Sequence, residues 1–269
     1  MEPVHLTDRA IVALEGAEAR EFLQGLVTND INRLAPGAGL YAALLTPQGK
    51  ILFDFLVTEG DGALLLDCAA ESAEALVKRL SMYRLRAKIG IAIRPQLSVY
   101  AGLSGRPAER AVTFPDPRLA DLGPRSIGAL AEMPDFLEGP AAYHARRLEL
   151  GVPEGVDFGS GAIFALDAGL EELHGVSFEK GCYVGQELTS RMKHRGTAKK
   201  RILALRADRA LPQAGEKILA GDMEIGEILS TYGLEAFALV RLDRLEQGKA
   251  SLKAGTIPVT VAIPEWLKA

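Results

Sequence analysis

The chain has 269 residues, of which 48% are hydrophobic and 25% charged, and its formal net charge is -4. This composition excludes a disordered protein and provides enough length for one large or two modest hydrophobic cores. The acidic balance excludes a basic field over the whole molecule for nucleic acid or anionic membrane, so any anionic partner must be met locally.

The first half of the chain predicts a strand-rich layer with two helices. In chain order we expect strands over 10–16, 40–46, 51–58, 63–69, 88–93 and 96–102 and helices over 17–27 and 71–83. The first helix has Ala19, Phe22 and Leu23 at helical spacing. Turn segments such as PQGK join three successive strands, so we expect an antiparallel meander.

The second half changes texture beyond Lys199. Residues 102–140 are rich in Pro and Gly and give only one strand, 126–130, before a helix over 141–151 and a glycine-rich loop. The later part predicts strands alone, with no helix, over 201–207, 216–221, 224–233, 236–245 and 257–263. We therefore predict an α+β body over 1–195, in two subdomains that divide near 100–135, and a small β-barrel or sandwich over 196–269.

Neither the N-terminal sequence, the apolar runs nor the cysteine content indicates a membrane or metal protein. No apolar run approaches the roughly 20 residues that span a bilayer. The start, MEPVHLTDRA, lacks the basic and apolar regions of a signal peptide, so we expect a cytoplasmic protein with no membrane partner. Cys68 and Cys182 are too few and too distant for a disulfide framework, a CxxC zinc site or a four-thiolate iron–sulfur cluster. We predict no metal held by this chain alone.

The stretch KGCYVGQE, residues 180–187, concentrates reactive chemistry. The overlapping stretch YVGQELTSRM, residues 183–192, predicts a helix. This helix would place Cys182 at its N-terminus, two residues from Lys180. Both neighbours would favour a reactive thiolate; the alternative is a small buried hydrophobe, as we expect for Cys68 in LLLDCAA. His174 and His194 are candidate bases by sequence position only, with a structural role as the alternative.

The same stretch carries a family resemblance. Extended as GVSFEKGCYVGQELTSRMKHRG, with Arg191 and the Arg195–Gly196 pair, it resembles the signature of the YgfZ family of folate-binding proteins. Mitochondrial relatives of that family assist late iron–sulfur cluster maturation, and the family is related to the T-protein of glycine cleavage, an aminomethyltransferase. FLQGLVTNDI, LLTPQGKILFDFLV and ARRLELGVP are similar to its other signatures, so the resemblance covers most of residues 8–205.

The resemblance implies an α+β body around a central cavity that binds tetrahydrofolate, capped by a C-terminal β-barrel. It implies an accessory protein for iron–sulfur cluster assembly, maturation or repair, with iron–sulfur client or assembly proteins as partners. Lys180, Cys182 and Tyr183 fall on the motif's lysine, cysteine and aromatic residue, and Gln186 and Glu187 on its closing pair. A pterin edge suits carboxylate or amide groups and its benzoyl stem suits aromatic walls; for Tyr183 the alternative is a packed core aromatic.

Asp54 decides between this function and catalysis. The resemblance implies that aminomethyl transfer in T-proteins depends on an aspartate pair at this point of the strand, where this chain has Phe53 and then Asp54. The loss of one acid argues against aminomethyl transfer, which stays an alternative together with other one-carbon transfer. Asp54, with Cys182 the second candidate catalytic residue, could still bind a pterin edge; the alternative is a polar residue on an exposed strand face.

Two further sets are candidate ligand contacts. Arg147 and Glu149 lie in a central family motif and could orient a folate, with a structural salt bridge as the alternative. A run without acids could bind the glutamate tail of a folate, namely Arg191, Lys193, His194, Arg195, Lys199, Lys200 and Arg201. A solvated face, an RNA-modification accessory protein and a scaffold without any ligand are the alternatives, RNA being disfavoured by the acidic charge.

Overall fold

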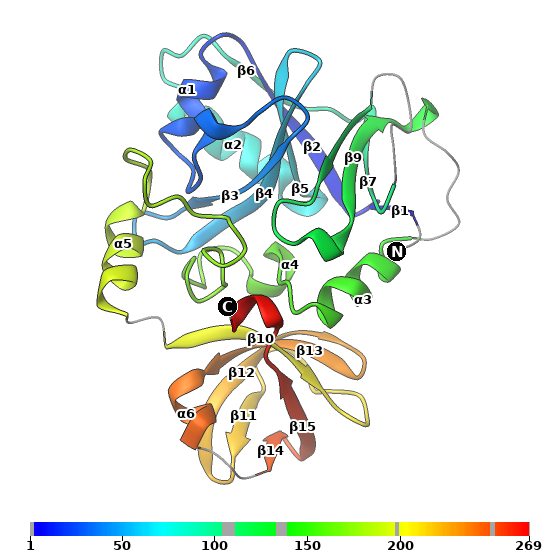
Figure 1. The fold of residues 1–269 in the computed structure, drawn as a ribbon, viewed down its shortest axis with the longest axis vertical. Coiled ribbons are helices and arrows are strands. Elements are labelled where there is room, and N and C mark those ends of the chain that lie inside the picture. Colours follow the sequence, from blue (N-terminus) through cyan, green and yellow to red (C-terminus); the bar gives the residue numbers. More distant parts are fainter. Residues whose placement is uncertain (1–2, 104–110, 133–138, 197–198, 248–250, 269) are drawn as a thin grey trace.

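Two antiparallel sheets lie side by side in one half of the molecule, and a closed barrel forms the other half along its long axis (Figure 1). The computed structural model describes residues 3–103, 111–132, 139–196, 199–247 and 251–268. The α+β class and the C-terminal barrel predicted from the sequence are confirmed. The division at residue 196 stays a prediction.

The first sheet contains the predicted meander. It has the strand order β3-β4-β5-β2-β6, formed by β2 (Arg9–Glu15), β3 (Gly39–Leu45), β4 (Ile51–Gly60), β5 (Ala63–Ala69) and β6 (Gly90–Ile93). Helices α1 (Ala19–Gln24) and α2 (Ala73–Tyr83) cover one face. Because strand side chains alternate, Phe55 packs under these helices while Leu56 faces the opposite core. Helix α1 is shorter than predicted because it ends at Gly25, whose N–H bonds back to its last turn.

Only two of the four strands of the second sheet were predicted from the sequence. Its order is β1-β7-β9-β8, with β1 (Val4–His5), β7 (Leu97–Ala101), β8 (Val112–Pro115) and β9 (Pro124–Ala129). We predicted β7 and β9 but missed β1 and β8, which have two and four residues and show no periodicity over so short a length. Residues 104–110 and 133–138 of the Pro- and Gly-rich stretch lie outside the described residues.

Helices between the sheets and the barrel complete the body. They are α3 (Ala141–Glu149), α4 (Gly155–Phe158) and α5 (Gln186–Arg195). The one-turn helix α4 forms inside the predicted glycine-rich loop because Glu154 and Asp157 make a reciprocal capping box at its start. Short 3-10 helices cover Ile31–Arg33, Ala70–Ser72, Ala120–Leu122, Leu130–Glu132 and Glu265–Leu267.

The barrel closes as β10-β13-β12-β11-β14-β15. Its strands are β10 (Lys200–Arg206), β11 (Lys217–Ala220), β12 (Met223–Tyr232), β13 (Glu235–Arg241), β14 (Leu252–Ala254) and β15 (Ile257–Ala262). The strand expected over 236–245 is wrong in its last four residues, and the expected absence of helix from the C-terminal part is wrong in the same place. Strand β13 ends at Arg241, which pairs with Asp243, and α6 (Leu242–Gln247) follows.

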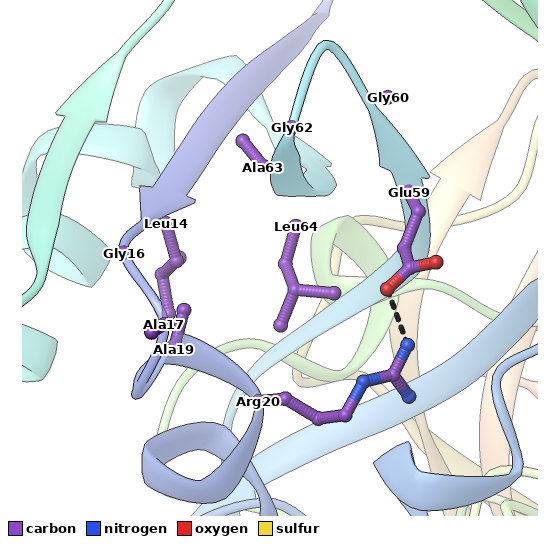
Figure 2. Close-up of a pocket in the computed structure, with 10 residues that line it drawn as sticks. All are labelled: Leu14, Gly16, Ala17, Ala19, Arg20, Glu59, Gly60, Gly62, Ala63 and Leu64. Carbon is purple, nitrogen blue, oxygen red and sulfur yellow. Dashed lines mark hydrogen bonds and ion pairs between the residues drawn. The ribbon is translucent and has the colours of Figure 1, made fainter.

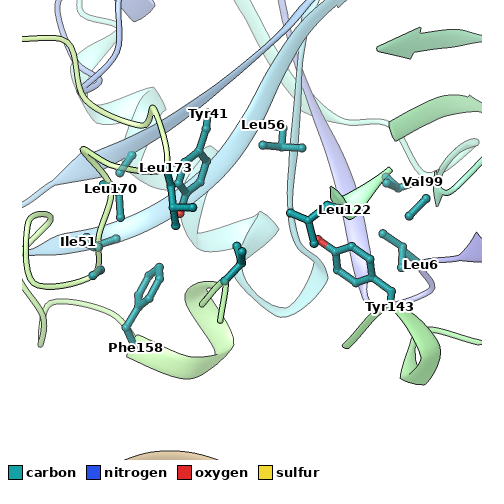
Figure 3. Close-up of a cluster of buried hydrophobic side chains, with 14 of the residues drawn as sticks. Leu6, Tyr41, Ile51, Leu56, Val99, Leu122, Tyr143, Phe158, Leu170 and Leu173 are labelled. Atoms are coloured by element: carbon teal, nitrogen blue, oxygen red, sulfur yellow. The ribbon is translucent and has the colours of Figure 1, made fainter. Parts of the chain in front are cut away.

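One apolar cluster joins the sheets to the helices below them. Figure 3 shows Tyr41 of β3 and Leu56 of β4 in the same cluster as Val99 of β7, Tyr143 of α3 and Phe158 of α4. Because the cluster draws on both sheets, burying its apolar surface fixes how the two sheets face each other.

The C-terminus fastens the barrel to the body. Trp266 Nε1 donates to the carbonyl of Leu150 at 3.0 Å, just after α3. Its ring lies against Gly169, where an added Cβ would come within 2.9 Å of it, and the φ of +75° there also favours glycine.

Candidate functional site

Asp54 points into the body from the middle of the meander. It is 6% exposed and accepts a hydrogen bond from the Tyr41 hydroxyl at 3.1 Å. It lies at a pocket of about 120 Å³ whose lining residues are Leu52, Phe53, Asp54, Ala69, Glu71, Ser72, Gly155, Phe158, Gly159 and Ser160. The alternative of an exposed strand face is therefore wrong.

The surroundings of Asp54 favour its protonated form. Burial raises the pKa of this carboxyl, with a further contribution from Glu154, while Arg9 and Arg118 oppose the shift. Gly155 leaves the carboxyl its room, since a Cβ there would come within 2.6 Å of Asp54 Oδ1. The pocket thus presents the buried carboxyl group of Asp54 close to neighbouring backbone, whereas Glu71 of its lining is exposed.

Beside Asp54, buried charged side chains occupy the junction of the two sheets and α3. Arg118 donates to Glu154 at 2.6 Å and to Asp116 at 2.7 Å, and Arg118 and Arg125 both donate to the Tyr143 hydroxyl at 2.7 Å. Burial alone would raise the pKa of Glu154, but Arg118 and Arg9 hold it well below its usual range. The sequence does not indicate this network, because Arg118 and Arg125 lie in the stretch without periodicity and two of their partners, Tyr143 and Glu154, are distant in sequence.

Lys180 is buried and ties the cysteine loop, which we define as residues 175–185, to the end of α1. Its ammonium donates to the carbonyls of Gln24, Val27 and Asn29 at 2.7, 2.6 and 2.8 Å. An ammonium has three N–H donors, so all of them are used within the protein. Burial lowers the pKa of Lys180 to about 8.

Further contacts bring three of the resembling segments together at this loop. Thr28 Oγ1 donates to the Gly175 carbonyl at 2.6 Å, and the Ser177 N–H donates to the Thr28 carbonyl at 3.0 Å. The turn between β3 and β4 closes on the other side, where a Cβ at Gly185 would come within 2.5 Å of the Thr46 carbonyl oxygen. Segments 22–31, 44–57 and 175–196 are therefore neighbours in space.

Cys182 is exposed, whereas Cys68 is buried. The alternative of a buried hydrophobe is wrong for Cys182, and so is its predicted place at a helix N-terminus. Helix α5 begins only at Gln186, because Gly185 adopts a left-handed φ of +83° that interrupts the helix. In the described part of the chain, no hydrogen bond or ion pair joins His174 or His194 to Cys182. Burial raises the pKa of the Cys68 thiol to about 12.

The other motif residues fall on two sides of the loop. Tyr183 is 7% exposed, belongs to the central apolar cluster and lies 5.3 Å, by its ring centroid, from the Lys180 nitrogen. Gln186 Nε2 contacts the Gly181 carbonyl at 3.4 Å. Glu187 points to solvent and pairs with Arg191 at 2.6 Å. Arg195 lies exposed in the last turn of α5.

Part of the predicted basic run is already neutralised. Lys193 pairs with Glu171, and Arg201 pairs with Glu172 at 3.0 Å. With the pair of Arg191 and Glu187, three of its cations contact carboxylates.

Arg147 lies at the joint between body and barrel rather than at either site. It is fully buried, pairs with Asp157, and donates to the Tyr232 hydroxyl of β12 at 2.7 Å. Glu149 points to solvent and pairs with Arg146 at 2.7 Å. The geometry matches the structural alternative for both residues.

A larger pocket of about 500 Å³ lies elsewhere and contains none of the predicted site residues. Figure 2 shows it between the end of β2, the start of α1 and the β4–β5 hairpin, with the ion pair of Arg20 and Glu59 in one wall. Leu14 and Leu64 supply buried apolar lining.

The structure brings the predicted residues to three separate places: the Asp54 pocket, the cysteine loop and the barrel joint. Within the described ranges, no group of three or more His, Cys, Asp or Glu side chains could hold a metal ion. Within the same ranges, no helix is both long and apolar enough to cross a bilayer.

Known proteins are similar to this chain over its barrel and over nearly its whole length. A family model described as CAF17, C-terminal beta-barrel domain, matches residues 199–269. The mouse and human proteins named iron-sulfur cluster assembly factor IBA57, mitochondrial, are 32% and 31% identical over 309 and 301 residues, and each comparison covers 97% of this chain and 84% of the relative.

A solved structure shares the fold. The glycine cleavage system aminomethyltransferase T from Bartonella henselae superposes with a TM-score of 0.76 at 18% identity, covering 98% of this chain and 85% of that one. At that identity the likeness shows the T-protein fold and nothing of the activity. Together with the likeness to the mouse and human proteins over nearly the whole sequence, it shows that the chain belongs to the IBA57/CAF17 family of YgfZ-type proteins.

Proposed function

We propose that this chain is an accessory factor for iron–sulfur cluster assembly that presents Cys182 to a partner protein. The observation that carries the proposal is the position of Cys182, exposed on a loop that buried Lys180 fixes through three backbone carbonyls. The names of the mouse and human relatives support it.

The cluster is then cargo and not a resident cofactor. Protein-bound clusters are held by several thiolates, and this chain has one exposed cysteine. Cys182 would therefore act as one ligand of a cluster shared with a partner, or as a thiol in its redox chemistry.

Removal of the Cys182 thiol should abolish this function without unfolding the protein. We expect Cys182→Ser to leave the activity of iron–sulfur enzymes at background in cells that lack the endogenous factor, because a hydroxyl replaces the thiol of Cys182. Cys68→Ala, which removes the other cysteine, should restore that activity as wild type does. Full restoration by Cys182→Ser would contradict the proposal.

We also propose that a tetrahydrofolate binds with its pterin ring at the Asp54 pocket. The residues fit one end of that ligand, since a buried carboxyl faces a hollow beside Gly155 and Phe158. The volume of about 120 Å³ is below the roughly 300–1,000 Å³ of whole small-molecule sites, so it accommodates a ring edge while the rest of the ligand extends outside. When bound, the folate would supply one-carbon or redox chemistry; Asp54 would hold and orient it.

Asp54→Asn should weaken tetrahydrofolate binding about tenfold or more, because an amide has one acceptor oxygen and a carboxylate has two. The two N–H donors of a bound pterin edge would favour the ionised form of Asp54 and so oppose its raised pKa. Calorimetric titration measures the affinity. Glu71→Gln is the matched control, since Glu71 lines the same pocket but is exposed. Equal affinity of Asp54→Asn and wild type would refute this site, and it would leave the Cys182 proposal untouched.

The remaining expectations stay predictions. Phe53 stands where the resemblance places the first acid of a transferase, and no contact of the described residues favours aminomethyl transfer or RNA binding. The cytoplasmic location is likewise a prediction, whereas the mouse and human relatives are named mitochondrial.

A further inference from the structure

A second basic segment lies far from the cysteine loop. Residues 78–88, the basic tip, run from the middle of α2 into the turn before β6 and contain no acidic residue. Its cations are Lys78, Arg79, Arg84, Arg86 and Lys88. None of the five forms an ion pair with any described carboxylate, in contrast to the run at 191–201, where three cations do.

The basic tip also exposes large apolar side chains. Met82 is 64% exposed and Leu85 is 90% exposed. Leu85 has a φ of +44°, a left-handed conformation that leucine rarely adopts because its Cβ comes too close to the following carbonyl oxygen. Cations at the end of a helix are stabilised by its dipole, and Arg84 also contacts the Ile89 carbonyl at 3.5 Å. These structural reasons account for the charges but not for the outward-facing Met82 and Leu85.

The position of the basic tip leaves it accessible. Figure 1 shows α2 and β6 at the end of the molecule opposite the barrel. The joint at Arg147 and the ties to the cysteine loop involve other elements. Leu80 of the tip packs in the core, while Lys78, Arg84, Arg86 and Lys88 are exposed.

We propose that the basic tip binds the surface of an anionic lipid bilayer, with Met82 and Leu85 inserted among the lipids and the five cations facing the headgroup phosphates. Basic residues beside protruding apolar side chains are typical of proteins that lie on membranes. A bilayer presents one sign of charge, which suits a tip with no acid. Binding through two side chains is reversible and does not require a membrane span.

Other anionic partners fit the tip less well. Single-stranded nucleic acid is bound by exposed aromatic side chains that stack on bases, and Tyr83, the only aromatic residue of the tip, is half-buried. Protein interfaces are depleted in Lys, whereas the tip carries two lysines beside its arginines.

Vesicle sedimentation tests the proposal. The full chain should sediment with phosphatidylcholine vesicles that contain a one-third share of phosphatidylglycerol, should not sediment with pure phosphatidylcholine, and should be released by salt. Arg84→Glu with Arg86→Glu should abolish binding. Lys199→Glu with Lys200→Glu, the same change of charge at the other basic run, should leave it unchanged.

Leu85→Gly separates insertion from charge attraction. It keeps all five cations and should weaken vesicle binding about tenfold. Because glycine adopts a positive φ freely, thermal stability should stay the same or rise, so weaker binding cannot come from unfolding. The membrane assignment is wrong if the wild type does not bind vesicles, or if Leu85→Gly binds them as tightly as the wild type does. It is also wrong if polyglutamate or single-stranded DNA displaces the wild type and Leu85→Gly from vesicles equally.

Discussion

Arg147→Met should lower the free energy of unfolding by about 3–5 kcal/mol, because it leaves a buried carboxylate without its counter-charge. Asp157 is fully buried as a side chain and is paired with Arg147. Arg147 also donates to His144 Nδ1 at 2.9 Å and to the Val152 carbonyl at 3.3 Å. Methionine fills much of the volume but donates none of these bonds.

The same substitution should loosen the barrel. Asp157 accepts hydrogen bonds from Ser230 at 2.6 Å and Tyr232 at 2.7 Å, both on β12, so Arg147 holds the acid that contacts the barrel. We expect hydrogen exchange to increase at the barrel face of β12 before global unfolding. Denaturant titration measures the stability change.

Arg146→Met is the matched control for this prediction. Arg146 is the preceding residue on α3, and its ion pair with Glu149 is partly exposed. Exposed pairs contribute roughly 0–1 kcal/mol, so Arg146→Met should change stability little. Equal effects of the two substitutions would show that burial and Asp157 do not determine the stability at this joint.

How far the sequence predicted the fold depended on the length of each pattern. The meander and most barrel strands were predicted because nearly continuous apolar runs extend over several residues between turn segments, as in β4 and β13. The two-residue β1 was missed because its pairing with β7 is set by a partner distant in sequence. The helix α6 was missed because LVRLDRL continues an apparent strand and turns into a helix only after Arg241.

The sequence indicated which residues belong to the candidate site but not how they are arranged in space. KGCYVGQE identified the exposed Cys182, but a resemblance cannot show what each residue contacts. The start of α5 is set by the conformation of Gly185, which packs against Thr46 of another motif. Arg118 and Arg125 could not be found from local patterns, because a buried ion pair has no signature in sequence order.

The ties around the cysteine loop suggest why several distant segments carry the resemblance at once. Thr28 and Asn29 bind the backbone at Gly175 and His174, and Lys180 binds the carbonyls next to them. A change in one segment would leave buried polar groups unpaired in the other. The motif therefore includes residues that fix the position of Cys182 as well as Cys182 itself.

Lys180→Met tests this explanation and should lower the free energy of unfolding by about 2–4 kcal/mol, because it leaves the carbonyls of Gln24, Val27 and Asn29 without their donor. Methionine also removes the ammonium that lies 5.3 Å from the Tyr183 ring centroid, so the effect reports the loss of the ammonium together with its hydrogen bonds. Denaturant unfolding measures the loss, and hydrogen exchange should rise in segments 22–31 and 175–185.

Lys193→Met is the control, because Lys193 is 47% exposed in its side chain and its substitution should change stability by no more than about 0.5 kcal/mol. The two possible roles of Lys180 then separate. If it positions Cys182, Lys180→Met should impair cluster-enzyme activity at temperatures where the variant is still folded, while tetrahydrofolate binding at Asp54 persists. If tetrahydrofolate binding is lost in a folded, stable Lys180→Met variant, Lys180 is a ligand contact and its carbonyl bonds must open to admit the folate.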